Sequence, residues 1–134
     1  MGQKVNPHVI RLGNVHTWTS RWFANGKDYK EIVIEDYLLR KQLMERLKGA
    51  GIARVEIERS INNLKIILHV SRPGIVIGRG GAGLEELKKS INKFFVQRKG
   101  KNNLRFDIRV EPVKEPNLDA QLVATNISEQ LIRR

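Results

Sequence analysis

Apolar residues recur at helical spacing in two stretches of the chain. Leu39, Leu43 and Leu47 follow one another at four-residue intervals, which places them on one face of a helix that starts at Asp36 and ends near Gly49. A second stripe with the same period begins after residue 82, and it consists of Leu84, Leu87, Ile91, Phe94 and Phe95. Both stretches are therefore predicted to be amphipathic helices that bury one face.

Three segments instead alternate apolar and polar residues, which is the period of a half-buried strand. They cover residues 54–58, 64–70 and 105–110. In the first of them, Val55 and Ile57 share one face. The letters SINN between the first two segments supply turn residues, so these two strands are predicted to pair as a hairpin.

Two further helices are indicated by proline. A short apolar helix is predicted to begin at Pro73, since proline suits the first turn of a helix. A last helix is predicted after Pro116, with Asn117 as its N-cap. Its apolar stripe would be Leu118, Leu122, Ile127 and Leu131.

These elements divide the chain into three parts. Residues 1–35 show no sustained period and are predicted to form an irregular arm. Residues 36–112 hold the order helix, strand, strand, helix, helix, strand, which predicts an α+β domain with a three-stranded sheet and helices packed on one face. Residues 113–134 would form a linker and the start of a further helix that leads toward a second domain.

Charge is the strongest global feature of the sequence. The chain carries 25 Lys and Arg against 14 Asp and Glu, a net charge of +11. Between residues 61 and 100 there are eight basic and two acidic residues, so the excess gathers in one window. A positive excess of this size indicates a polyanionic partner, and nucleic acid fits better than a membrane because no basic amphipathic anchor is present.

Several classes of function are disfavoured by the composition. The chain has no cysteine, which excludes disulfides and thiolate metal sites. His8, His16 and His69 lack the spacing of metal ligands, so no metal and no cofactor are expected. No nucleophile motif or carboxylate pair suggests an enzyme. No apolar run approaches the roughly 20 residues of a membrane helix, and no secretory signal is visible, so a soluble cytosolic protein is expected.

The segment VIGRGGAGLEEL places four glycines between residues 78 and 83. A Walker P-loop would need Lys and Ser or Thr where Leu84 and Glu85 stand. GRGGAG does match the dinucleotide fingerprint, but that motif follows directly from a strand, and Pro73 with Gly74 intervene here. The third alternative is the I-G-x-x-G loop of K-homology (KH) domains, at residues 77–81, in which bare backbone meets a sugar-phosphate chain. A turn that only packs two helices together remains open.

The whole element order around this loop resembles the type II KH domain. A more specific resemblance lies in MGQKVNPHVIRLG, WTSRWFA, SRPGIVIGRGG and EPNLDAQLVATNISEQLIRR, which are similar to the S-three family of small-subunit ribosomal proteins of bacteria and organelles. The resemblance runs over the length of the chain. Where the family loop usually holds a second basic residue this chain has Gly80, and the second α/β domain of the family does not follow Arg134.

The resemblance implies a structural constituent of the ribosome that binds ribosomal RNA. It would lie in the head of the small subunit, near the point where mRNA enters, among neighbouring head proteins and on a cytoplasmic bacterial or an organellar ribosome. The alternative is a stand-alone KH regulator of single-stranded RNA. The predicted RNA-binding residues are Lys4, Arg11, Arg72, Gly78, Arg79, Gly80, Gly81, Lys88, Lys89, Arg133 and Arg134. The last two would be candidate mRNA contacts.

Two further sets of residues each have two possible interpretations. Lys88, Lys89 and Lys93 form either a stripe that faces phosphates or an ordinary solvated helix face. The aromatic residues of WTSRWFA, at positions 18, 22 and 23, either stack on bases or pack against protein.

Overall fold

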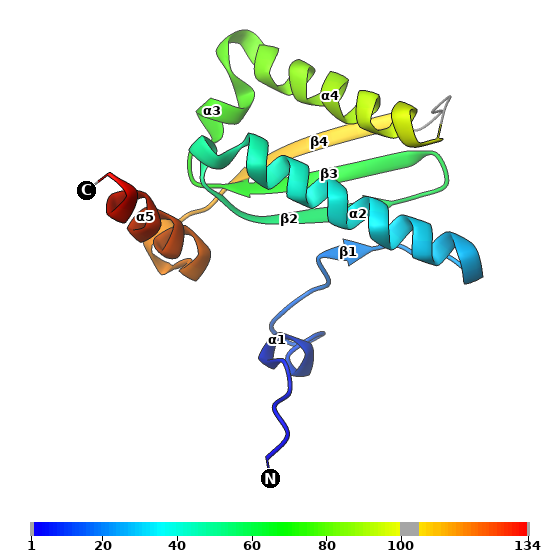
Figure 1. The fold of residues 1–134 in the computed structure, drawn as a ribbon, viewed down its shortest axis with the longest axis horizontal. Coiled ribbons are helices and arrows are strands. Elements are labelled where there is room, and N and C mark those ends of the chain that lie inside the picture. Colours follow the sequence, from blue (N-terminus) through cyan, green and yellow to red (C-terminus); the bar gives the residue numbers. More distant parts are fainter. Residues whose placement is uncertain (1, 100–104, 134) are drawn as a thin grey trace.

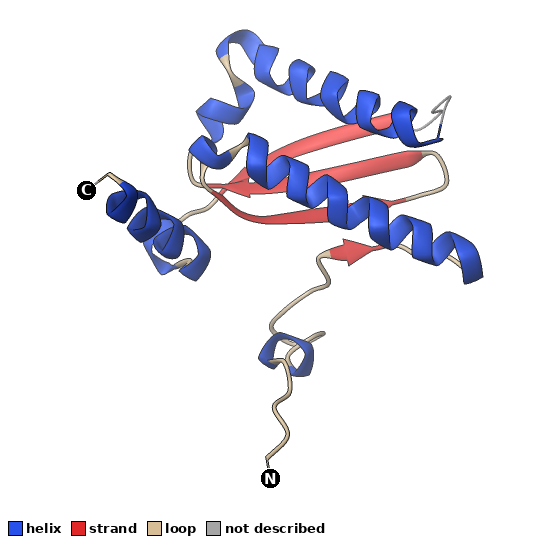
Figure 2. Ribbon diagram, in the orientation of Figure 1, coloured by secondary structure: helices blue, strands red, loops and turns tan. Residues whose placement is uncertain are grey.

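The computed structural model describes residues 2–99 and 105–133 of the 134-residue chain. Within these residues, four helices and four strands carry the fold, together with a single-turn helix near the N-terminus and three short 3₁₀ turns (Figures 1 and 2). In chain order the elements are α1 (Pro7–Ile10), β1 (Ser20–Arg21), α2 (Gly26–Arg46), η1 (Lys48–Ala50), β2 (Ile52–Arg59), β3 (Asn63–Val70), α3 (Pro73–Ile77), η2 (Arg79–Gly81), α4 (Ala82–Lys99), β4 (Arg105–Pro112), η3 (Pro116–Leu118) and α5 (Ala120–Ile132).

The strands form one mixed sheet in the order β1-β2-β3-β4. β2 and β3 are an antiparallel hairpin in which Val55 lies opposite Leu68 and Ile57 opposite Ile66, so the predicted hairpin is confirmed. β4 pairs in parallel with β3, and β1 pairs in parallel with β2. The three predicted strands are present. The two-residue β1 adds a fourth strand to the predicted three-stranded sheet, and no alternating pattern in the sequence predicts it.

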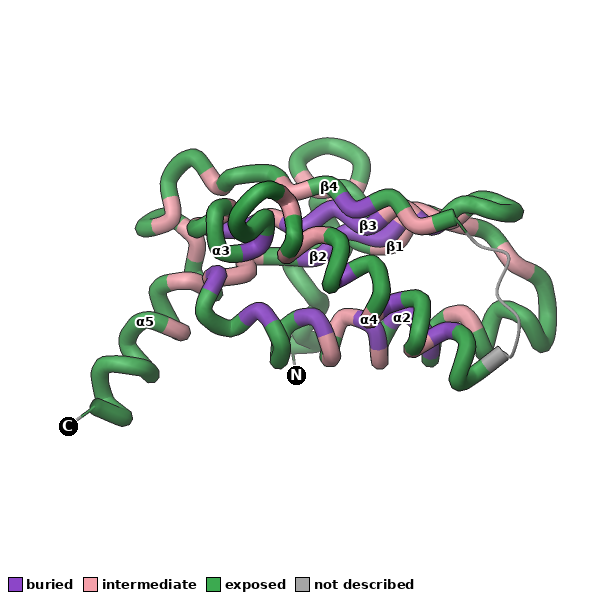
Figure 3. The backbone as a smooth tube through the Cα atoms, turned by 90° about the horizontal axis from the view of Figure 1, so that it is seen from above, coloured by how far each residue is buried: buried purple, intermediate pink, exposed green. Residues whose placement is uncertain are grey.

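Helices α2 and α4 lie on the same face of this sheet, and Figure 3 shows the other face open. The predicted stripes supply the core between them. Its fully buried large side chains are Phe95, Leu39, Ile57, Leu64, Ile66, Leu68, Val70 and Val76. Burying each aliphatic or aromatic side chain contributes about 1.5–3 kcal/mol. The α+β class and the one-sided helical layer are therefore confirmed.

The predicted start of the first long helix, at Asp36, is wrong, because α2 already begins at Gly26. The reason is chemical: the positions of α2 that face the core at its centre are Glu35 and Asp36, each 2% exposed. Two carboxylates interrupt the apolar stripe, so its N-terminal half does not show as helical. The boundary predicted between residues 35 and 36 lies inside α2, and the division of the chain into three parts stays a prediction.

Arg59 compensates these buried carboxylates. Its Nε donates to Asp36 at 2.8 Å and its Nη1 donates to Glu35 at 3.0 Å. The other Asp36 oxygen accepts from Ser20 Oγ at 2.9 Å and from Trp22 Nε1 at 2.8 Å. A buried charge is tolerated only when it is paired and hydrogen-bonded. This cluster of Ser20, Trp22, Glu35, Asp36 and Arg59, here called the arm anchor, fixes β1 to α2 and β2.

The predicted N-cap of the last helix is also wrong. Asn117 lies within the 3₁₀ turn η3, and Asp119 caps α5 by accepting from the backbone N–H of Gln121 at 3.0 Å and of Leu122 at 3.1 Å. Asp and Asn are equally good caps, so the sequence offered two candidates within three residues. The apolar stripe of α5 is largely exposed, with Ile127 at 53%.

On the open face of the sheet, Lys65 Nζ lies 2.7 Å from Glu58 Oε2, and this hydrogen bond is the main cause that lowers the pKa of Glu58 below its usual value. In Lys65→Met we expect the pKa of Glu58 to rise, as followed by carboxyl NMR titration. The stability that the pair adds is present at neutral pH and is lost as pH falls through the folded-state pKa. Arg109→Met is the control, because Arg109 is the weakest contributor, and an equal rise there would contradict the assignment.

In the described part of the chain, no helix combines the length and the apolar character needed to cross a bilayer.

Candidate nucleic-acid interface

The glycine segment forms a tight turn between α3 and α4. Gly78 ends α3 with a φ of +69°, and the 3₁₀ turn η2 follows before α4 begins at Ala82. Inside the turn, Gly80 has a φ of +61° and Gly81 a φ of +84°. Residues other than Gly, Asn and Asp rarely adopt this left-handed backbone conformation. The predicted short helix from Pro73 and the long helix after the glycines are both confirmed.

The outer glycines of the segment serve the packing of the two helices. A Cβ added to Gly83 would lie 2.5 Å from the carbonyl oxygen of Val76, and one added to Gly78 would lie 2.9 Å from the amide nitrogen of Gly83. Real Cβ atoms essentially never approach other atoms so closely. Since Val76 is 1% exposed, this backbone contact holds α4 against a part of α3 that is anchored in the core.

The middle of the turn is different, because it faces open space. A Cβ added to Gly80 or to Gly81 would meet nothing within 4 Å. Arg79, between these glycines and Gly78, is exposed. The alternative in which the glycines only pack two helices therefore explains Gly78 and Gly83 but leaves the middle positions without a packing role.

The charges around the turn are positive. Arg72 and Arg79 are exposed at the two ends of α3, and Lys88 and Lys89 are exposed on α4. Among the described residues, no carboxylate lies within the 4 Å of an ion pair from any of these four side chains. Glu86 is instead paired with Arg46 at 2.9 Å. The turn therefore presents bare backbone and unpaired cations, which suits a phosphate chain.

A family model described as "KH domain" matches residues 38–118, which is more than half of the chain. The chain belongs to the KH-domain family. The match contains the whole turn and its two flanking helices, so Gly78–Gly81 is named the KH loop below. The type II arrangement predicted from the element order is confirmed, with a mixed four-stranded sheet.

The relatives of this KH protein are ribosomal. The chain is 49% identical over 134 residues to small ribosomal subunit protein uS3 of Caldicellulosiruptor bescii, 47% to that of Acetivibrio thermocellus and 45% to that of Coxiella burnetii. In each case the whole chain aligns, and it spans 58%, 56% and 56% of the relative, respectively. The resemblance to the S-three family is thereby confirmed. Their names describe ribosomal proteins and no enzyme, in keeping with what was expected of this chain.

The KH fold brings together some predicted site residues and separates others. The KH loop, Lys88 and Lys89 lie on α3–α4, and Arg72 lies one short helix away from the loop. Lys4 and Arg11 belong to the arm, which leaves the domain on the side away from this turn (Figure 1). Arg133 is the C-cap of α5, and Arg134 lies outside the described residues.

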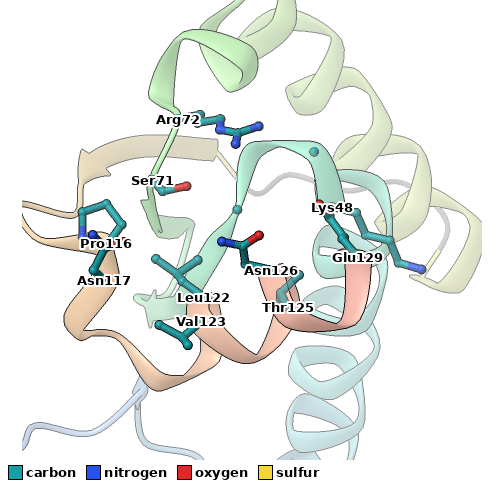
Figure 4. A pocket seen from close by; sticks show the side chains of 12 residues that line it. Lys48, Ser71, Arg72, Pro116, Asn117, Leu122, Val123, Thr125, Asn126 and Glu129 are labelled. Atoms are coloured by element: carbon teal, nitrogen blue, oxygen red, sulfur yellow. The ribbon is translucent and has the colours of Figure 1, made fainter. Parts of the chain in front are cut away.

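A groove beside Arg72 separates α5 from the KH domain (Figure 4). Its volume is about 300 Å³, and Lys48 and Arg72 line it together with Asn126 and Glu129 of α5. The carboxylate of Glu129 partly offsets the two cations, so this groove is less positive than the KH loop. The described residues hold no cluster of three or more side chains that could bind a metal ion.

The arm anchor was not expected from the sequence. Trp22 packs into it and meets Tyr29 with ring centroids 5.3 Å apart, whereas Trp18 is 64% and Phe23 86% exposed. The three aromatic residues of the arm therefore have different environments. The signal that was available is the pair of acidic residues at the centre of an otherwise amphipathic helix.

Proposed function

We propose that this KH protein is a structural component of the small ribosomal subunit and binds ribosomal RNA through its KH loop. The observation that carries the proposal is the combination of exposed Gly80 and Arg79 with cations that have no described carboxylate within ion-pair distance. The likeness to uS3 supports the ribosomal assignment, and the chain spans a little over half of those relatives.

The loop geometry suggests how RNA would be held. With no Cβ at positions 80 and 81, a ribose-phosphate chain can lie against the backbone, and the Arg79 guanidinium can donate to a phosphate oxygen. Ile75 and Ile77, at 55% and 38% exposure, offer apolar surface beside the loop for a base. Lys88 and Lys89 would extend the positive surface along α4 to the next phosphates.

The finer location belongs to the same proposal and depends on the likeness to uS3. The protein would lie in the head of the small subunit, beside neighbouring head proteins and near the point where mRNA enters. Arg133, the C-cap of α5, and the next residue in the sequence, Arg134, would then be its mRNA contacts. It would act on a cytoplasmic bacterial or an organellar ribosome.

The test is the double variant Arg79→Asp/Gly80→Asp. Asp tolerates the left-handed conformation of Gly80, so the fold should be kept. Because a charge-assisted hydrogen bond is lost and a repulsion gained, affinity for small-subunit ribosomal RNA should fall about tenfold or more, with a smaller salt dependence. Filter binding across a salt series measures both quantities.

The matched control is Asn25→Asp/Lys27→Asp, which changes net charge equally at the exposed N-terminus of α2, where acidic residues are tolerated. Its affinity should stay within about twofold of wild type. Equal loss in both variants would mean that only net charge matters, and unchanged affinity in the loop variant would remove the KH loop from the interface. Sedimentation of a cell lysate separates the ribosomal role from that of a stand-alone regulator. A ribosomal protein should sediment with the small subunits, whereas a regulator should sediment as free protein.

A further inference from the structure

A second surface lies on the opposite flank of the domain from the KH loop, where the arm meets α2. A groove of about 550 Å³ runs between them, and Trp18, Trp22, Tyr29, Val33 and Arg40 are among its lining residues. This volume is in the range of pockets that hold small planar ligands. From the arm, Trp18 contributes a ring that is 64% exposed, and Tyr29 of α2 contributes one that is 56% exposed.

Three lining side chains of this groove, those of Trp22, Tyr29 and Arg40, are held in place by contacts within the protein. Trp22 Nε1 donates to the buried Asp36 at 2.8 Å, and the Tyr29 ring packs on the Trp22 ring at 5.3 Å. Arg40 donates to the carbonyl oxygen of Thr19 at 3.0 Å and also to Ser20 Oγ, which holds the arm beside the helix. An aromatic side chain that is already ordered loses little conformational freedom when a ring stacks on it.

The charge of the groove is positive. Asp36 lines it, but its carboxylate is 2% exposed and is paired with Arg59. Arg40 hydrogen-bonds to neutral oxygens, and burial is the main cause that lowers its pKa from the usual value for arginine. Lys30 and Lys41 of α2 are also exposed. Lys30 follows Tyr29 in the sequence, and Lys41 lies one helical turn beyond Tyr37, whose exposed ring extends the aromatic surface along this flank of α2.

A neighbouring groove on the other side of Trp22 has the opposite character. It is lined by the exposed acidic residues Asp28 and Glu31 together with Phe23 and Ile61. Arg59 also lines it, but its side chain is 10% exposed and is paired with the buried carboxylates of the arm anchor. The two flanks of α2 therefore differ in charge. The flank with the Trp18 groove combines aromatic rings with cations, whereas the flank with the Phe23 groove combines an aromatic ring with exposed carboxylates. Only the first flank has the composition that nucleic acid needs, because an RNA strand would be repelled by the second.

We propose that the groove between Trp18, Tyr29 and Arg40 is a second RNA site, which stacks an unpaired base on the exposed aromatic rings while Arg40, Lys30 and Lys41 contact the adjoining phosphates. The proposal rests on the proposed function only in taking RNA as the ligand. It concerns other residues than the KH loop. A base between Trp18 and Tyr29 would contribute affinity with little sequence preference, since every base has a stacking face.

The test uses the tryptophan emission of the full chain, which has two tryptophans. The probes are a uridylate dodecamer and an abasic ribose-phosphate dodecamer of equal charge. Stacking should quench Trp18 with the uridylate and not with the abasic probe. Trp18→Ala should weaken uridylate binding about fivefold or more, whereas Trp18→Phe keeps a ring and should largely restore it.

Phe23→Ala is the matched control, because Phe23 is an arm aromatic that is even more exposed than Trp18 and lies beside the acidic groove, and the affinity of this variant should equal that of wild type. In Arg79→Asp/Gly80→Asp, quenching of Trp18 should persist. If Arg79→Asp/Gly80→Asp loses RNA affinity, Trp18→Ala does not, and the emission of Trp18 is not quenched, the proposed function stands and this second site is refuted. Equal quenching by the abasic probe also refutes it. Unchanged emission with both probes would refute it as well.

Discussion

Replacing Arg59 with alanine is expected to lower the free energy of unfolding by about 3–5 kcal/mol. Arg59 is the counter-ion of two carboxylates, and the Glu35 and Asp36 side chains are both 3% exposed while that of Arg59 is 10% exposed. Removing the cation takes the Arg59 guanidinium away from two negative charges in a site that water reaches poorly. Breaking a buried pair from one side costs far more than the intact pair contributes.

Urea denaturation followed by circular dichroism measures this loss. Arg54→Ala is the matched control, since Arg54 also pairs with a strand carboxylate, Glu56, but its side chain is 60% exposed. Exposed ion pairs contribute about 0–1 kcal/mol, so the control should remain near wild type. If both variants unfold at the same urea concentration, the arm anchor is not a stabilising feature.

A second expectation concerns the arm. Arg59→Ala should increase protease cleavage before residue 26, because Asp36 loses the neighbour that holds its orientation toward Ser20 and Trp22.

Replacing Gly83 with alanine is the second large effect, with an expected loss of about 1–3 kcal/mol in stability. The new methyl group would lie 2.5 Å from the carbonyl oxygen of Val76 and 3.0 Å from that of Ile77, and both are backbone atoms that cannot rotate away. The two helices must therefore move apart, and RNA affinity should fall as well, because Arg79 would shift with the KH loop.

Gly74→Ala is the control within the same region. Gly74 lies in α3, where an added Cβ would meet nothing within 4 Å, so alanine should be neutral or should stabilise by up to about 1 kcal/mol. Thermal unfolding of the two variants gives the comparison. A lower melting temperature in Gly74→Ala than in Gly83→Ala would contradict the close approach of α3 and α4.

The core of this fold was readable from the sequence because its apolar residues follow one period per element. Leu64, Ile66 and Leu68 alternate on β3, and Leu87, Ile91 and Phe95 recur on α4; all are buried as predicted. The turn of glycines was also identified, together with the helices on either side. Periodicity is informative here since each element has one apolar face and one solvated face.

What could not be predicted depends on contacts between distant residues. The N-terminal half of α2 was missed because Glu35 and Asp36 are buried against Arg59, which follows them by more than twenty positions in the sequence. β1 was missed because two residues have no detectable period, and Ser20 is held there by Asp36 and the edge of β2. No pattern in the sequence indicates that the arm, to which Lys4 and Arg11 belong, leaves the domain on another side from the KH loop.

The four glycines between residues 78 and 83 imply two different outcomes in a mutational library. Selection for soluble, folded protein alone should deplete substitutions at 78 and 83, where main-chain atoms of neighbouring turns touch. At 80 and 81 the same selection should spare asparagine and aspartate, which accept a positive φ. Selection for growth, if the KH loop acts on the ribosome as proposed, would then deplete the negatively charged member of that pair.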